Sequence, residues 1–168
     1  MYDELTAVDI KKMQEEINHR VRVLRPQLIE EVQVTRAFGD LSENYEYKCA
    51  KQAKNRNESR IRYLERMIRT AKVIQVKEEQ EDTVSLFDKV TIYNEMMKKE
   101  MTIQIVTTLR QDALKGLISK ESPIGQALMG RRIGDRVQVE VNPTTKYFVE
   151  IRAIEKGEDD DSLEISKY

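Results

Sequence analysis

Two carboxylates three residues apart, Asp40 and Glu43, are the pair in this chain with the clearest chemical potential. Magnesium prefers carboxylate oxygens, but two of them make an incomplete site, because Mg²⁺ keeps several waters and takes further ligands. A metal held here would need more carboxylates from a partner. The same spacing also fits a capping box, in which Asp40 caps a helix and Glu43 reaches back to it.

The other residue types that often carry chemistry are scarce. The chain has 168 residues, one Cys and one His. The single Cys49 excludes an internal disulfide and a thiolate zinc cage, and we interpret it as a bystander thiol on a helix. His19 has no second metal-ligating residue near it, which favours a solvated helix position.

Charge divides the chain into two parts. The net charge is −1, but residues 1–76 carry +3 and the remainder carries −4. The segment 45–72 contains nine Lys and Arg against three Glu. This basic stripe would suit a polyanion or an acidic protein surface, although a solvated helix face has the same composition.

The first part has the periodicity of two long helices. Apolar residues spaced by three and four predict a helix over 8–37, interrupted near 23–25 because Pro26 lacks an amide donor. They are Ile10, Met13, Ile17, Val21, Leu24, Leu28 and Val32. A second seam comprises Tyr47, Ala50, Lys54, Asn57, Ile61, Leu64, Ile68 and Ala71. Its first half is less apolar, so we expect weak packing there.

A short turn between the helices forces them to be antiparallel neighbours. Gly39 can end the first helix in a left-handed conformation, and Asp40 can cap the second. The prediction is a long coiled-coil hairpin, residues 1–76, with an acidic tip.

The second part has a different pattern. After a polar linker, 77–85, alternating residues predict antiparallel strands over 87–93, 101–108, 136–141 and 146–154. A short helix should run from the N-cap Ser122, with Pro123 at its first position, to Gly130. The prediction is an α+β chain whose second domain, 86–156, is a sheet with one helix, followed by an acidic tail, 157–168, without chemistry of its own.

Two motifs closely resemble the GreA/GreB family of bacterial transcript-cleavage factors. The first is FGDLSENYEY at 38–47 with RIRYLE at 60–65; the second is GLIS at 116–119 with SPIGQAL at 122–128 and GD at 134–135. The resemblance runs from Arg25 in the first helix to Ile151 in the last strand. It implies a coiled-coil hairpin followed by an FKBP-like domain, without implying isomerase activity.

The resemblance also implies a partner and a mechanism. The hairpin would enter the secondary channel of RNA polymerase, where Asp40 and Glu43 would help to hold a Mg²⁺ shared with the polymerase, none being bound stably by this chain alone. The polymerase, not this chain, would then hydrolyse the 3′ end of backtracked RNA. Asn44, Tyr45 and Glu46 would support the tip.

Further residues follow from the same resemblance. Arg36, Lys48 and Lys51 would attract the RNA 3′ end. Tyr45 and Tyr47 would either stack on a base or pack the tip. Two departures from the family pattern stand out: Asp9 and Ile10 lie near a usual glycine, and 105–110 replaces a segment that usually carries Gly and acidic residues.

Two other functions compete with transcript cleavage. One is a polymerase-channel binder that regulates or inhibits transcription without cleavage. The other is an adaptor whose basic arm holds RNA or a protein groove.

No apolar run approaches the ~18 residues of a membrane helix, and the N-terminus lacks signal-peptide features, so we expect a cytoplasmic protein without a membrane partner. Because the two helices of one hairpin would bury each other's apolar residues, the sequence predicts a monomer.

Overall fold

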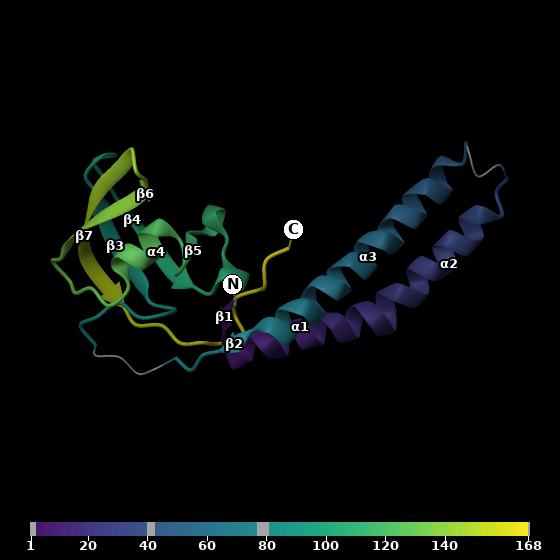
Figure 1. Cartoon of the computed structure of the whole chain (residues 1–168), viewed down its shortest axis with the longest axis horizontal. Helices are drawn as coiled ribbons and strands as arrows, with labels where there is room; N and C mark the ends of the chain where they lie inside the picture. The colour runs from purple at the N-terminus through teal and green to yellow at the C-terminus, as the bar shows by residue number, and fades with distance from the viewer. Residues whose placement is uncertain (1–2, 40–42, 77–80, 168) are drawn as a thin grey trace. The chain divides into compact units, whose positions relative to one another are not determined.

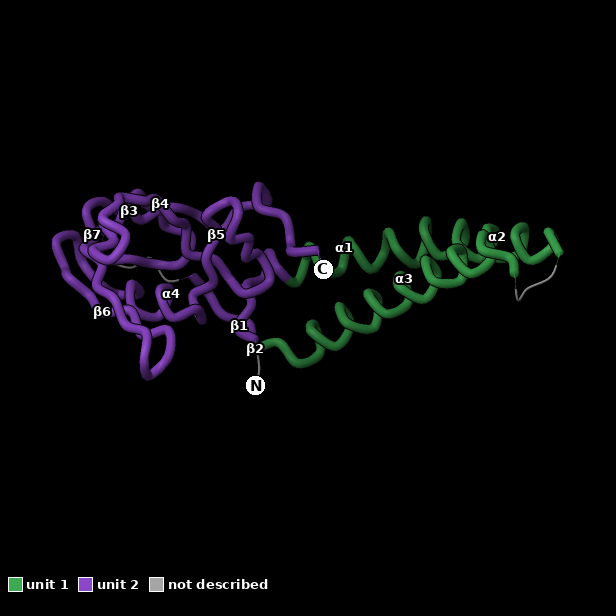
Figure 2. Tube along the Cα trace, turned by 90° about the horizontal axis from the view of Figure 1, so that it is seen from above, with its two compact units in different colours: residues 1–2, 10–71 green, residues 3–9, 72–168 purple. Residues whose placement is uncertain are grey.

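The computed structural model describes residues 3–39, 43–76 and 81–167 of the chain. It divides into two compact units (Figure 2), one comprising residues 10–71 and the other residues 3–9 with those after 71. The sequence had placed residues 3–9 with the hairpin; their contacts place them in the second unit. Residues 77–80 of the predicted linker lie outside the described residues.

The first unit is the predicted helical hairpin (Figure 1). Its first arm comprises α1, Ala7–His19, a π-helical segment, Arg20–Leu24, and α2, Arg25–Arg36. Its second arm is α3, Tyr45–Thr70, which packs along α2. The interruption predicted from Pro26 is therefore present but begins slightly earlier. It is a π segment closed by a hydrogen bond from the Arg25 amide to the Arg20 carbonyl, five residues back.

The apolar core of the hairpin is confined to one end. Met13 and Ile17 of the first arm are buried, together with Ile61, Leu64 and Met67 of α3. Met67 takes the position that the periodicity gave to Ile68, which is only half-buried. We call 25–36 and 45–56 the tip half; there α2 has no buried residue and α3 has only Ala50. The predicted weak packing of this half is confirmed.

A polar layer separates the apolar core from the tip half. Arg60 donates from Nε and Nη2 to the two carboxylate oxygens of Glu16, over 2.9 and 3.1 Å. Arg20 donates to Glu16 over 2.7 Å and to Oδ1 of the buried Asn57 over 3.1 Å. Asn57 Nδ2 in turn lies 3.4 Å from the Arg20 carbonyl, in the π segment. The bonds between Arg60 and Glu16 and between Arg20 and Asn57 cross the seam and fix the register of the two arms, because a one-turn slip would separate these polar groups.

Replacing Glu16 by Gln should make the stability of the hairpin less dependent on pH in acid. Burial raises the pKa of Glu16, but hydrogen bonds from Arg60 and Arg20 outweigh it and hold the pKa below its ordinary value. Such a group stabilises the fold above its unfolded pKa, about 4.3, and this contribution is lost as pH falls through the folded pKa. Denaturant unfolding followed by circular dichroism should show a larger loss of stability for the unmodified protein between about pH 6 and about pH 3. Equal losses would contradict the assignment.

The second unit is built on a five-stranded sheet in the order β5-β4-β3-β7-β6. Its strands are β3, Lys89–Asn94, β4, Lys99–Val106, β5, Leu117–Ser119, β6, Arg136–Asn142, and β7, Thr145–Glu155. The four predicted strands are present and antiparallel. The short β5 was missed and pairs parallel with β4, so the sheet is mixed. A second, two-stranded sheet pairs β1, Glu4–Leu5, with β2, Lys72–Val73.

The SPIG motif forms the start of the predicted short helix, α4, Pro123–Leu128. Ser122 is the N-cap and its Oγ accepts from the Gly125 amide over 3.0 Å. Gly125 is needed because a Cβ there would lie 2.2 Å from the Ser119 carbonyl oxygen. The Leu128 side chain then reaches the core of the sheet, among Val90, Ile92, Ile105, Val139 and Ile151.

A buried arginine holds together three distant segments of this unit. Arg110 is 1% exposed. It donates to Asp9 over 2.6 Å and to Asp159 over 2.6 Å, and its guanidinium lies 4.8 Å from the centre of the Phe87 ring. Both departures from the family pattern, at Asp9 and in 105–110, thus contribute to one ion cluster. The acidic tail, to which the sequence assigned no chemistry of its own, has a structural role that was not predicted, because Asp159 is part of this cluster.

Replacing Arg110 by Met should destabilise the second unit strongly. The substitution leaves the carboxylates of Asp9 and Asp159 without their cation, and breaking a buried ion pair in this way costs about 3–5 kcal/mol. The matched control is Lys146→Met, which removes an exposed ion pair of 3.3 Å with Glu140 and should cost below about 1 kcal/mol. The free energy of unfolding in denaturant measures both. Equal, small losses would mean that the cluster does not stabilise the fold.

Candidate functional site at the hairpin tip

The N-cap of α3 is Asn44. Its Oδ1 accepts from the Tyr47 amide over 3.0 Å, and its Nδ2 donates to the Thr35 carbonyl over 2.6 Å. One side chain therefore satisfies an amide at the start of α3 and a carbonyl near the end of α2. This tie holds the two ends of the hairpin at the tip.

The capping box predicted for Asp40 and Glu43 is wrong. Asp40 lies outside the described residues, but α3 begins at Tyr45, so neither residue occupies the N-cap. Glu43 precedes the cap and is exposed. No described residue makes a hydrogen bond or an ion pair with the Glu43 carboxylate. Its oxygens suit a hard cation such as Mg²⁺, and folding of the helix does not use them.

Two aromatic rings at the tip face solvent. Phe38 is 62% exposed and Tyr45 is 76% exposed, so the packing alternative is wrong for Tyr45. A hydrogen bond with the Cys49 thiol raises the pKa of Tyr45. Tyr47, two residues further along α3, is half-buried. An exposed ring presents a face on which a base or another ring can stack.

The basic residues expected to attract RNA come from both arms. Arg36 is the last residue of α2, and Lys48 and Lys51 follow on the first turns of α3. All three side chains are exposed. They belong to the same end of the hairpin as Glu43, which places cations near a candidate metal-binding carboxylate.

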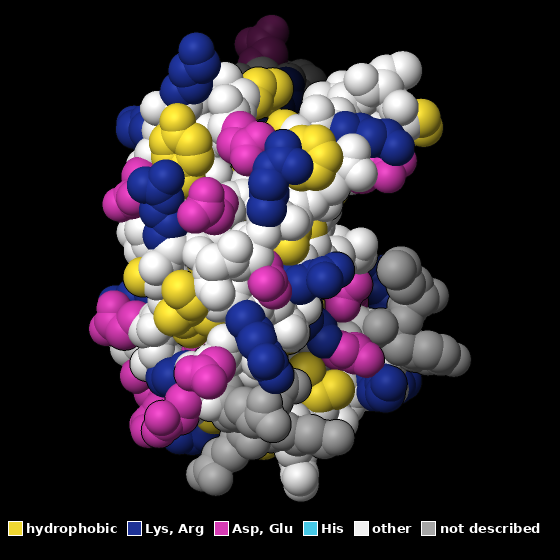
Figure 3. Space-filling view, turned by 90° about the vertical axis from the view of Figure 1, so that its left-hand side faces the viewer, with side chains coloured by type: hydrophobic (Ala, Val, Ile, Leu, Met, Phe, Trp, Pro, Cys, Tyr) yellow, Lys and Arg dark blue, Asp and Glu magenta, His cyan; other side chains and the backbone are white. Residues whose placement is uncertain are grey.

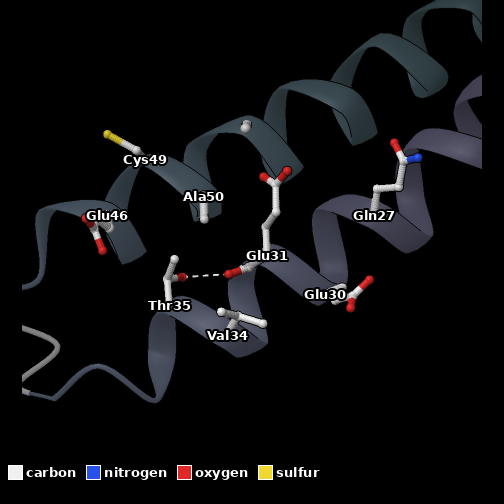
Figure 4. A pocket seen from close by; sticks show the side chains of 9 residues that line it. Gln27, Glu30, Glu31, Val34, Thr35, Glu46, Cys49 and Ala50 are labelled. Atoms are coloured by element: carbon white, nitrogen blue, oxygen red, sulfur yellow. Dashed lines mark hydrogen bonds between the residues drawn. The ribbon is translucent and has the colours of Figure 1, made fainter.

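A groove between α2 and α3 was not predicted (Figure 4). Glu30 and Glu31 of α2 and Glu46 of α3 contribute to its lining. The less apolar first half of the second seam indicated weak packing here, but periodicity does not give the shape of the space left between two helices. The signal that was available is the run of small residues, Cys49, Ala50 and Ala53, where a packed seam would carry larger side chains.

On the face of the second unit shown in Figure 3, neither positive nor negative side chains gather as they do at the hairpin tip. Lys and Arg side chains there alternate with Asp and Glu. One described pair is Arg136 with Glu95, joined by hydrogen bonds of 2.6 and 2.8 Å while the guanidinium stacks on Phe148. Such neutralised pairs make a poor site for a polyanion.

Comparison with known proteins assigns the family. The family model "Transcription elongation factor, N-terminal" matches residues 4–73, and "Transcription elongation factor, GreA/GreB, C-term" matches residues 79–156. The chain belongs to the GreA/GreB family of transcription elongation factors. The resemblance seen in the two motifs is thereby confirmed, as is the α+β fold class.

The curated relatives cover most of this chain. Transcription elongation factor GreA of Thermoanaerobacter pseudethanolicus is 42% identical over 137 residues, which is 82% of this chain and 87% of that protein. GreA of Geobacillus kaustophilus is 40% identical over 150 residues, 89% of this chain and 94% of that one. Among solved structures, GreA factor homolog 1 of Thermus thermophilus is 23% identical, with a TM-score of 0.42, and the match covers 93% of this chain and all of that one.

None of the helices described for this GreA/GreB family member has the length and apolarity to cross a membrane.

Replacing Asn44 by Ala should loosen the tip without unfolding the hairpin. Loss of an N-cap costs about 1 kcal/mol, which corresponds to roughly fivefold faster exchange of the Tyr47 amide if that amide opens locally. Hydrogen exchange read by NMR measures this rate. Asn44→Asp is the control, because it keeps the acceptor for the Tyr47 amide and loses only the donor to Thr35. Unchanged exchange in Asn44→Ala would contradict the role of this cap.

Proposed function

We propose that this chain binds RNA polymerase, inserts its hairpin into the secondary channel and stimulates cleavage of the 3′ end of backtracked RNA by the polymerase active centre. Membership of the elongation-factor family supports the choice of partner. The observation that carries the cleavage role is that Asn44, not Asp40 or Glu43, caps α3. The start of α3 therefore uses neither carboxylate of the acidic pair as its cap, and Glu43, the described member of the pair, is exposed.

The hairpin supplies reach. α3 has 26 residues and is therefore about 39 Å long. An arm of this length, only two helices wide, can carry a carboxylate into a channel that a globular domain could not enter. The buried core at its far end and the polar layer in its middle keep the two arms in register over that distance.

The tip residues would then have separate tasks. Asp40 and Glu43 would contribute oxygens to a Mg²⁺ shared with polymerase carboxylates. When bound, that ion supplies activation of water and neutralisation of phosphate charge. Arg36, Lys48 and Lys51 would attract the RNA backbone toward the tip. The exposed Tyr45 ring would stack on a base at the RNA 3′ end.

This division of tasks makes the chain an accessory factor. It would position groups and provide oxygens, while the polymerase provides the remaining metal ligands and performs the hydrolysis. No general base of this chain is assigned. A factor of this kind should have no nuclease activity on free RNA.

Asp40→Asn and Glu43→Gln should each strongly reduce stimulated cleavage while leaving polymerase binding intact. Both substitutions remove a charged metal ligand, so we expect a rate at least roughly tenfold lower at limiting Mg²⁺, with partial recovery at high Mg²⁺. Backtracked complexes with 3′-labelled RNA provide the assay. The matched control is Glu65→Gln, an exposed glutamate on α3 far from the tip, which should behave like the unmodified protein.

Three results would count against the proposal. Binding of the unmodified protein without any cleavage would identify a channel regulator instead. Cleavage that survives both substitutions would show that the acidic pair does not supply ligands. Salt-sensitive binding to free RNA with no affinity for polymerase would favour the adaptor function.

A further inference from the structure

In the groove between α2 and α3, the side chains of the two helices leave space between them. It has a volume of about 740 Å³ and lies in the tip half. Small side chains, Ala50 and Ala53, face it from α3, and Val34 faces it from α2. Helices in a packed pair normally interdigitate larger side chains, so this stretch leaves space that a side chain from another molecule can enter.

The apolar floor of this groove has an acidic surround. Its described lining contains three glutamates, Glu30, Glu31 and Glu46, and neither Lys nor Arg. Figure 4 shows Glu31 extending from α2 toward α3, and Ala50 pointing toward α2. Glu30 and Glu31 are both exposed. Three like charges around a concave apolar surface attract a cationic group and repel a polyanion.

The groove and the basic residues of α3 belong to different faces of the helix. Groove residues 46, 49, 50 and 53 follow the spacing of one helical face. Lys48 and Lys51 fall outside this series, and neither lines the groove. The same turns of α3 can therefore meet a nucleic acid on one side and a cationic protein surface on another.

From this arrangement we infer that the groove docks a segment of RNA polymerase that presents an apolar side chain flanked by Lys or Arg. The inference rests on the proposed function for the identity of the partner. The sign of the charge excludes RNA from the groove, and its volume is within the range of about 300–1,000 Å³ typical of binding pockets. Docking there would hold the hairpin at a fixed rotation within the channel, so that the tip carboxylates face the active centre.

Reversing the charge of the groove tests this assignment. Glu30→Lys combined with Glu31→Lys should weaken binding to core polymerase roughly tenfold, because a cationic segment would then meet cations. The matched control, Glu15→Lys combined with Glu65→Lys, makes the same change in net charge at exposed hairpin positions outside the groove, and should change affinity less than about twofold. Affinity is measured by titration with labelled protein, and circular dichroism verifies that each variant keeps its helices.

The single cysteine permits a second readout. Cys49 is exposed and lies at the groove, so a maleimide benzophenone attached there should cross-link to polymerase. Mass spectrometry should find the adduct beside Lys or Arg and an apolar residue. The control probe is carried by Asn55→Cys in a Cys49→Ser background, on another face of α3, and should give a different adduct.

The outcomes separate this inference from the proposed function. Equal affinities for the two charge-reversed variants, or adducts on RNA, on a second copy of this chain or on an acidic polymerase segment, would overturn the docking site while leaving stimulated cleavage intact. Failure of the unmodified protein to bind polymerase would overturn both. Weakened binding of the groove variant alone, with an adduct on a basic segment, would support the inference.

Discussion

A hairpin of two long helices has one seam to hold it together, and in this chain a layer of hydrogen-bonded charges interrupts that seam. Glu16, Arg20, Asn57 and Arg60 join the arms across it, and the π segment supplies one of the carbonyls that they use. Below the layer the seam is apolar and closed; beyond it the seam is open. Buried polar groups tolerate only one pairing, so this layer sets the register that every position nearer the tip inherits.

At the tip, the residue that ties the two arms together is not one of the residues proposed to act in cleavage. Asn44 closes the hairpin by bonding to both arms. Since one neutral side chain performs this task, the charged groups around it remain exposed: Glu43, Lys48 and Lys51. Their proposed roles require them to be presented to a partner, and a helix whose cap was one of those carboxylates would have to give up stability to engage it.

The second unit shows a different solution to the burial of charge. Arg110 is enclosed by two carboxylates and an aromatic ring, which compensate the loss of water around the guanidinium. Its partners come from the start of the chain and from its acidic tail. The cluster accounts for the burial of Asp9, since without Arg110 this carboxylate would lie in the interior without a cation.

The sequence by itself determined the helices, the four longer strands, the capped α4 and the family, because these follow from periodicity and from short motifs. It also indicated weak packing near the tip, from the missing apolar residues of the second seam. Tertiary structure decided which residue caps α3, where the polar layer lies, and that Arg110 meets Asp9 and Asp159. The cap is a local contact, but the bonds between the arms and those of Arg110 join residues 37 to 101 positions apart, whose mutual distance depends on chain topology and not on local spacing. The groove could not be predicted for the same reason, because it depends on how the side chains of two separate helices pack against each other.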